Sequence, residues 1–180
     1  PAQATLGYMY YYGYGVDKDY DKSYEWTKKA ADQGDDMALS NLAELYLRGL
    51  SVSKDTEKAL ILYKGAADKG NPFASAFMGY FYAQGLYTTQ DIETAQNWYA
   101  RTLKEKDATL FLRLGESYYT DGTPDPDPIE AYLWIYLAAQ HDEVLAKDKL
   151  EVLQQELTPA QQAQAMQRIE TLDLLSKLEK

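Results

Sequence analysis

The chain repeats itself every 36 residues, and this periodicity limits the folds that it can adopt. A leucine or methionine recurs at Leu6, Leu42, Met78 and Leu114. The next residue is small each time, and an aromatic follows at Tyr10, Tyr46, Tyr82 and Tyr118. Self-similarity at a fixed period of roughly 20 to 50 residues is typical of stacked supersecondary units. Such units bury their apolar faces against their neighbours and present one long surface, so we expect binding rather than catalysis.

Each repeat predicts two helices joined by a short loop. Apolar residues at spacings of three and four, such as Ala38, Leu42 and Leu45, predict first helices at about 2–13, 37–49, 73–85 and 108–121. Glycine favours the left-handed backbone of a helix end, so these helices should stop at Gly13, Gly49, Gly85 and Gly122. Second helices are expected at about 20–33, 56–69, 92–105 and 128–140, each after an N-cap aspartate: Asp19, Asp55, Asp91 and Asp127.

The ends of the second helices differ along the chain. Gly34 and Gly70 end the first two, whereas Lys106 and Asp142 stand at that position later and predict a different cap. Residues 143–155 read as a further helix. Thr158, Pro159 and Gln161 then form a capping-box pattern that starts a last helix to about residue 178. We therefore predict four repeats over 1–142 (about 1–34, 35–70, 71–106 and 107–142) and C-terminal capping helices over 143–180.

Composition excludes several classes of function. The chain has 28 acidic and 18 basic residues, a formal charge of −10, and nucleic-acid binding depends largely on neutralising phosphates with Lys and Arg. We therefore expect no nucleic-acid partner. No 18-residue apolar run is present, so no membrane span is expected. There are no cysteines, which excludes disulfides, thiol nucleophiles and the common structural zinc sites.

Candidate catalytic and metal-binding motifs are weak. Gly13-Tyr14-Gly15 lacks the strand before it and the Lys-Ser/Thr ending of a phosphate loop. Asp17, Asp19 and Asp21 have a calcium-loop spacing but lack its glycine and its final glutamate, and the pair Asp125 and Asp127 is better explained as a rigid loop ending in a cap. His141 is the only histidine, and we expect it at a helix end. We predict no catalytic residue, no metal site and no cofactor, and so no enzyme.

The repeat resembles the Sel1-like repeat, a relative of the tetratricopeptide repeat. Its first copy carries nearly the whole motif: Ala2, Leu6, Gly7, Tyr10, Gly13, Gly15, Val16, Asp19, Trp26, Lys29, Ala30, Ala31 and Gly34. Ser23 replaces the usual alanine, and the fourth copy lacks the Gly-x-Gly-Val loop. The resemblance implies an all-α, right-handed α/α superhelix that binds proteins or peptides. It also favours a bacterial envelope or secreted location over the cytoplasm, and brings no catalytic residue.

Tyrosines supply the candidate binding surface. Trp26, Trp98 and Trp134 recur in one phase and are expected in the core. In the related tetratricopeptide geometry, the second, fifth and sixth positions after the leucine of each repeat face the concave groove. Tyrosine is a preferred hot-spot residue because it joins a broad apolar face to a hydroxyl. We therefore predict that these residues bind the partner: Tyr8, Tyr11, Tyr12, Glu44, Leu47, Arg48, Tyr80, Gln84, Glu116 and Tyr119.

The leading hypothesis is an interaction scaffold that holds a peptide, helix or loop of a partner protein in this groove. Glu44 and Glu116, in a chain of charge −10, favour basic flanks on that partner. The alternative is a carbohydrate- or cell-wall-associated envelope protein that uses the same aromatic residues. Because the chain starts directly in a first helix, we also expect upstream repeats or a self-contact at the N-terminal face, which carries Leu6 and Tyr10.

Overall fold

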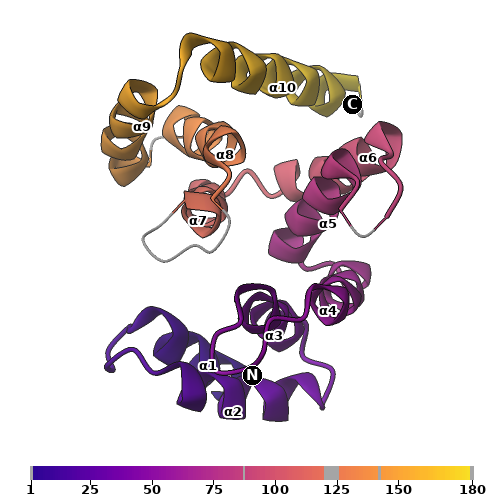
Figure 1. The fold of residues 1–180 in the computed structure, drawn as a ribbon, viewed down its shortest axis with the longest axis vertical. Helices are drawn as coiled ribbons and strands as arrows, with labels where there is room; N and C mark the ends of the chain where they lie inside the picture. The colour runs from indigo at the N-terminus through magenta and orange to yellow at the C-terminus, as the bar shows by residue number, and fades with distance from the viewer. Residues whose placement is uncertain (1, 87, 120–125, 142, 179–180) are drawn as a thin grey trace. The chain divides into compact units, whose positions relative to one another are not determined.

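The computed structural model describes residues 2–86, 88–119, 126–141 and 143–178, and every regular element within them is a helix (Figure 1). The repeat pairs are α1 (Ala2–Tyr12) with α2 (Tyr20–Ala31), α3 (Asp36–Arg48) with α4 (Thr56–Asp68), α5 (Pro72–Gln84) with α6 (Ile92–Leu103), and α7 (Ala108–Tyr119) with α8 (Pro128–Gln140). The tail forms α9 (Val144–Glu156) and α10 (Pro159–Leu178). The predicted all-α fold is confirmed, and the predicted helices agree with these bounds to within a few residues.

The predicted caps explain where the helices begin and end. Gly13, Gly49 and Gly85 have φ values of 77°, 68° and 66° at the ends of α1, α3 and α5. Each predicted aspartate accepts a backbone hydrogen bond, for example from Lys22 N to Asp19 at 3.0 Å and from Glu130 N to Asp127 at 3.0 Å. Thr158 and Gln161 cap each other reciprocally at the start of α10. Gly122, Asp125 and Asp142 lie outside the described residues.

The prediction of a different cap at Lys106 was wrong. Lys106 has φ 51°, in the left-handed region that Gly34 and Gly70 also occupy with φ 80° and 93°. Its N–H donates to the Leu103 carbonyl at 3.3 Å, as the N–H of Gly70 donates to Ala67 at 3.0 Å. The turn into the next repeat therefore keeps its conformation without glycine, at a cost of roughly 1–2 kcal/mol for a residue that bears a β-carbon.

The helices form two compact units, residues 1–98 and 99–180, which divide within α6. In the first unit, successive helices from α1 to α5 pack in chain order, and α1 also contacts α3. Its core includes Tyr63, whose ring stacks on Phe77 with centroids 4.5 Å apart. Leu6 and Tyr10 are half-buried, and upstream repeats or a self-contact there stay a prediction.

In the second unit, α8 packs against α7, α9 and α10 (Figure 1). Trp134 of α8 is fully buried, with ring centroids 5.7 Å from Tyr99 and 5.8 Å from Phe111. Its predicted core position is confirmed, whereas Trp26 and Trp98 are only half-buried. His141 lies at the C-terminal end of α8, as predicted. None of the helices in the described ranges has the length and apolarity that crossing a bilayer requires.

Small residues allow paired helices to approach closely, and two glycine substitutions test this. A β-carbon on Gly115 would overlap Ile135 and lie 3.1 Å from the Ala131 carbonyl, whereas one on Gly65 would meet only Leu39, at 3.9 Å. We expect Gly115→Ala to lower the free energy of unfolding by about 1–3 kcal/mol through overpacking. Gly65→Ala, the matched control, should raise it by about 0.5–1 kcal/mol because alanine loses less backbone entropy in a helix. Equal effects in urea denaturation would contradict this explanation.

Candidate binding sites

A cluster of tyrosines covers the end of α1 in the first unit. Tyr8 and Tyr12 lie one helical turn apart, with ring centroids at 4.6 Å. Gly13 ends the helix in the left-handed conformation, and the Tyr14 N–H turns back to the Met9 carbonyl at 3.0 Å. This reversal stacks Tyr14 on Tyr12 at 5.5 Å and leaves its side chain 53% exposed. The rings of Tyr8, Tyr12 and Tyr14 therefore form a continuous, partly exposed patch, which we call the tyrosine patch.

Tyr11 and Glu44 lie beneath this surface, whereas the sequence predicts them among the residues of the concave groove that bind the partner. They are only 7% and 2% exposed, respectively. The reason is that α1 packs against α3 as well as α2, so that their facing positions become an interhelical contact. Arg48 pairs with Glu44 at 3.0 Å, and its side chain is 10% exposed. Burial, and then the Glu44 carboxylate, raise the pKa of Tyr11 well above its usual value, so this phenol stays neutral.

The other predicted residues of the first unit stay partly accessible. Leu47, Arg48, Tyr80 and Gln84 are half-buried, as are Tyr8 and Tyr12. The structure thus brings Tyr8, Tyr11 and Tyr12 together and joins Glu44 to Arg48 by an ion pair. Sequence reasoning did not include Tyr14, although the left-handed glycine before it was a usable signal. Because the chain turns back at Gly13, the side chain of the next residue, Tyr14, lies against the preceding helix α1.

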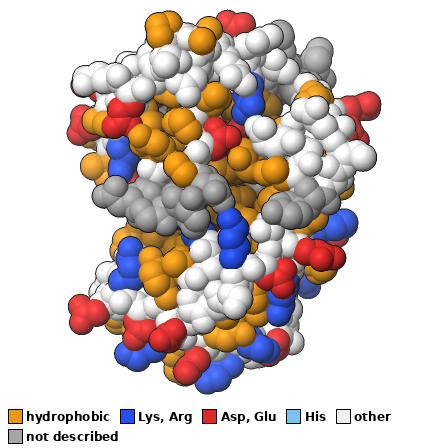
Figure 2. Space-filling view, viewed as in Figure 1, with side chains coloured by type: hydrophobic (Ala, Val, Ile, Leu, Met, Phe, Trp, Pro, Cys, Tyr) orange, Lys and Arg blue, Asp and Glu red, His pale blue; other side chains and the backbone are white. Residues whose placement is uncertain are grey.

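A pocket of about 340 Å³ opens in the second unit between α7, α8 and α9. Its lining includes two of the predicted site residues, Glu116 and Tyr119 of α7. Ile135 of α8 and Val152 and Leu153 of α9 supply apolar walls, and Asp148 and Lys149 of α9 complete the lining together with Gly115. Figure 2 shows one face of the molecule, on which apolar side chains are interspersed with charged ones. The lining of this pocket has the same mixed character.

Polar contacts join α7 to α9 around this pocket. Lys149 Nζ lies 3.0 Å from Glu116 Oε1, and the Tyr119 hydroxyl donates a hydrogen bond to Glu156. Sequence reasoning missed the contribution of α9 because this helix lies outside the repeat and has no equivalent position to compare. The available signal was the spacing of Lys149, Val152 and Glu156, which places them on one helical face.

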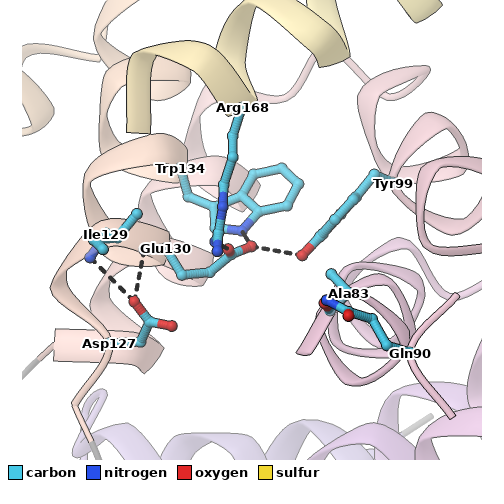
Figure 3. A network of polar contacts seen from close by, with 8 residues as sticks. All are labelled: Ala83, Gln90, Tyr99, Asp127, Ile129, Glu130, Trp134 and Arg168. Carbon is cyan, nitrogen blue, oxygen red and sulfur yellow. Dashed lines mark hydrogen bonds and ion pairs between the residues drawn. The ribbon is translucent and has the colours of Figure 1, made fainter. Parts of the chain in front are cut away.

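A fully buried carboxylate, Glu130, joins several side chains of the second unit (Figure 3). Its Oε1 accepts hydrogen bonds from Tyr99 Oη at 2.8 Å and from Trp134 Nε1 at 3.0 Å. Its Oε2 pairs with Arg168 Nη1 at 2.9 Å, which attaches α10 to α8. Burial raises the pKa of Glu130, and Arg168 and Tyr99 oppose this shift. Because protein donors occupy both oxygens and the side chain is inaccessible, we interpret this residue as structural rather than catalytic.

Known proteins resemble this chain in its repeat and in its fold. The Sel1 repeat model matches residues 1–35, 36–71, 72–106 and 112–143. A Sel1 repeat protein from Oxalobacter formigenes has a similar structure, with a TM-score of 0.57 and 30% identity over 83% of this chain and 59% of its own. The c5321 protective antigen of uropathogenic Escherichia coli, which displays an SLR fold, matches with a TM-score of 0.54 and 22% identity over 98% of this chain and 52% of its own. The chain thus spans little more than half the length of these bacterial structures, and the comparison with curated proteins found no match.

Proposed function

This chain belongs to the Sel1 repeat family, and we propose that it is a non-catalytic scaffold that binds a partner protein on the accessible side chains of its first helices. The resemblance seen in the sequence, and the α/α solenoid fold that it implies, are confirmed. Sel1 repeats are generally protein–protein interaction modules, and the family is typically non-catalytic.

The observation that carries the proposal is the partly exposed tyrosine patch. Interface hot spots are enriched in tyrosine, and three mutually packed rings lose little conformational freedom when a partner covers them. Leu47, Tyr80 and Gln84 extend the proposed surface in the first unit, whereas Arg48 is largely held in its ion pair with Glu44. In the second unit, Glu116 and Tyr119 are the proposed contact residues. Tyr11 and Glu44 support this surface from beneath. The charge of −10 favours a partner segment with basic residues, through steering and complementarity.

Selection of binding peptides tests the proposed surface. Peptides would be selected from a random phage-displayed library on the whole chain, and their affinities measured by calorimetry. We expect Tyr8→Ala combined with Tyr14→Ala to weaken the selected peptides by about 1–3 kcal/mol in sum, because both rings are lost from the contact. Ile61→Ala is the control, since Ile61 is an exposed apolar residue of α4, which is the second helix of its repeat and not one of the first helices.

Two outcomes of the peptide selection, and a separate glycan array, decide between the hypotheses. Weakening by the tyrosine changes, with none by the Ile61 change, supports the proposal. Unchanged affinity in both variants contradicts the role of the tyrosine patch. The carbohydrate alternative would require saturable binding on a glycan array that the same tyrosine changes abolish, and such a result would replace the proposed protein partner.

A further inference from the structure

We propose that the pocket between α7, α8 and α9 binds an apolar side chain of the partner that is flanked by lysine or arginine. This inference rests on the proposed scaffold function and deepens it, because it names the chemistry that one site recognises. The pocket of about 340 Å³ is at the small end of ligand sites, which span roughly 300–1,000 Å³. It therefore suits one anchoring side chain of a larger partner better than a complete extended ligand.

The walls of the pocket favour an apolar anchor. Ile135 and Leu153 are buried and form its inner part, and Val152 lines it while remaining 55% exposed. Covering Val152 and filling the pocket would remove apolar surface from water, at about 25 cal/mol per Å². A sugar placed there would exchange water for aliphatic carbon around its hydroxyl groups, which is unfavourable without new hydrogen bonds. The inner walls therefore favour a Phe, Leu or Met side chain over a glycan.

The charges around the pocket favour basic residues beside that anchor. Glu116 and Asp148 line it, and Glu156 accepts a hydrogen bond from the lining residue Tyr119. Lys149 is the cation of the lining and contacts the Oε1 atom of Glu116. A carboxylate has about four acceptor positions, so Glu116 can accept a second cationic donor without losing Lys149. Among these described residues, the carboxylates of Glu116, Asp148 and Glu156 outnumber the ammonium of Lys149, so the pocket should attract Lys or Arg and repel Asp or Glu.

Designed peptides test this inference directly. The probe is the nine-residue peptide Ser-Gly-Ser-Lys-Phe-Lys-Ser-Gly-Ser, and its two controls carry Glu-Phe-Glu or Lys-Ala-Lys at the centre. Binding to the ¹⁵N-labelled whole chain would be followed by amide chemical shifts. We expect saturable shifts at Ile135, Val152 and Leu153 with the Lys-Phe-Lys peptide, and about tenfold weaker binding of each control. Higher ionic strength should weaken the binding, because the rim charges are partly exposed.

Two variants separate the apolar part of the recognition from the charged part. Val152→Asp should weaken the Lys-Phe-Lys peptide about tenfold or more, because it places a hydrated carboxylate in the apolar wall. Val144→Asp is the matched control: Val144 lies on the same helix, is 70% exposed and is not part of the pocket lining, so binding should not weaken. Asp148→Lys should weaken the Lys-Phe-Lys peptide and strengthen the Glu-Phe-Glu peptide.

The outcomes distinguish this inference from the proposed function. If the peptide binds equally to the wild type and to Val152→Asp, or shifts only residues of α1 and α3, the pocket assignment is overturned while the scaffold proposal stands. Equal binding of the Lys-Phe-Lys and Glu-Phe-Glu peptides overturns the charge preference. If library selection on the whole chain also yields no binding peptide, the scaffold proposal fails together with this inference.

Discussion

Glu130→Ala is expected to lower the free energy of unfolding by about 3–5 kcal/mol, because it removes the common acceptor of a buried network. Tyr99, Trp134 and Arg168 all donate to this carboxylate. Without it, the buried indole N–H of Trp134 and hydroxyl of Tyr99 would lose this acceptor, which costs more than losing a hydrogen bond at the surface. The measurement is urea denaturation followed by tryptophan fluorescence, since Trp134 belongs to the network.

Arg168→Met provides the comparison for this prediction. It removes the guanidinium but leaves Tyr99 and Trp134 bonded to Glu130, which can also take up a proton in place of the lost cation. Its effect should therefore be smaller than that of Glu130→Ala. A Glu130→Ala variant within 1 kcal/mol of the wild type would contradict the expected contribution of the network to stability.

The burial of Glu130 also makes the difference in unfolding free energy between the wild type and Glu130→Gln depend on pH. The pKa of Glu130 in the folded chain is raised above its ordinary value of 4.5, first by burial and against the opposing effect of Arg168. The folded state then holds the proton more tightly than the unfolded state between these two pKa values. The part of the stability that comes from this tighter proton binding is therefore complete below pH 4.5 and is lost as pH rises through the folded-state pKa. We expect the unfolding free energy of the wild type, minus that of Glu130→Gln, to fall as pH rises from 4.5 through the folded-state pKa of Glu130 and to be constant above it.

Glu44→Ala is expected to destabilise the first unit by about 3 kcal/mol, at the low end of the range for breaking a buried ion pair. It removes the carboxylate that pairs with Arg48, whose side chain is only 10% exposed. The small remaining exposure allows some solvation of Arg48, which limits the cost. Guanidinium titration with circular dichroism would measure the change in unfolding free energy.

The double variant Glu44→Leu with Arg48→Met is the control for this ion pair. Replacing both charges by apolar groups of similar size is often nearly neutral, because the cost of burying charge disappears together with the attraction. We expect it to recover most of the stability that Glu44→Ala loses. If the single variant is as stable as the wild type but binds selected peptides less well, Glu44 is a binding residue and the structural interpretation of this pair is wrong.

The helices themselves could be predicted because the signals that define them are local. The hydrogen bond from Lys22 N to Asp19 spans three residues, and the left-handed turn at Gly49 requires little beyond the absence of a β-carbon. Both features can be found in a single repeat and checked against the next. Lys106 is the instructive exception, because it adopts the same left-handed turn although its β-carbon disfavours that conformation.

Accessibility could not be predicted in this way, because it depends on contacts between residues far apart in the chain. The 36-residue spacing places Tyr8, Glu44, Tyr80 and Glu116 at equivalent positions, yet Glu44 is buried and the others are half-buried. The difference arises because α1 covers α3 and a bulky Tyr11 fills the space between them. Likewise, the pocket and the Glu130 network require α9 and α10, which lie outside the repeat. Spacing alone therefore determines which residues share a helical face, whereas the packing of the neighbouring helices determines which of them can reach a partner.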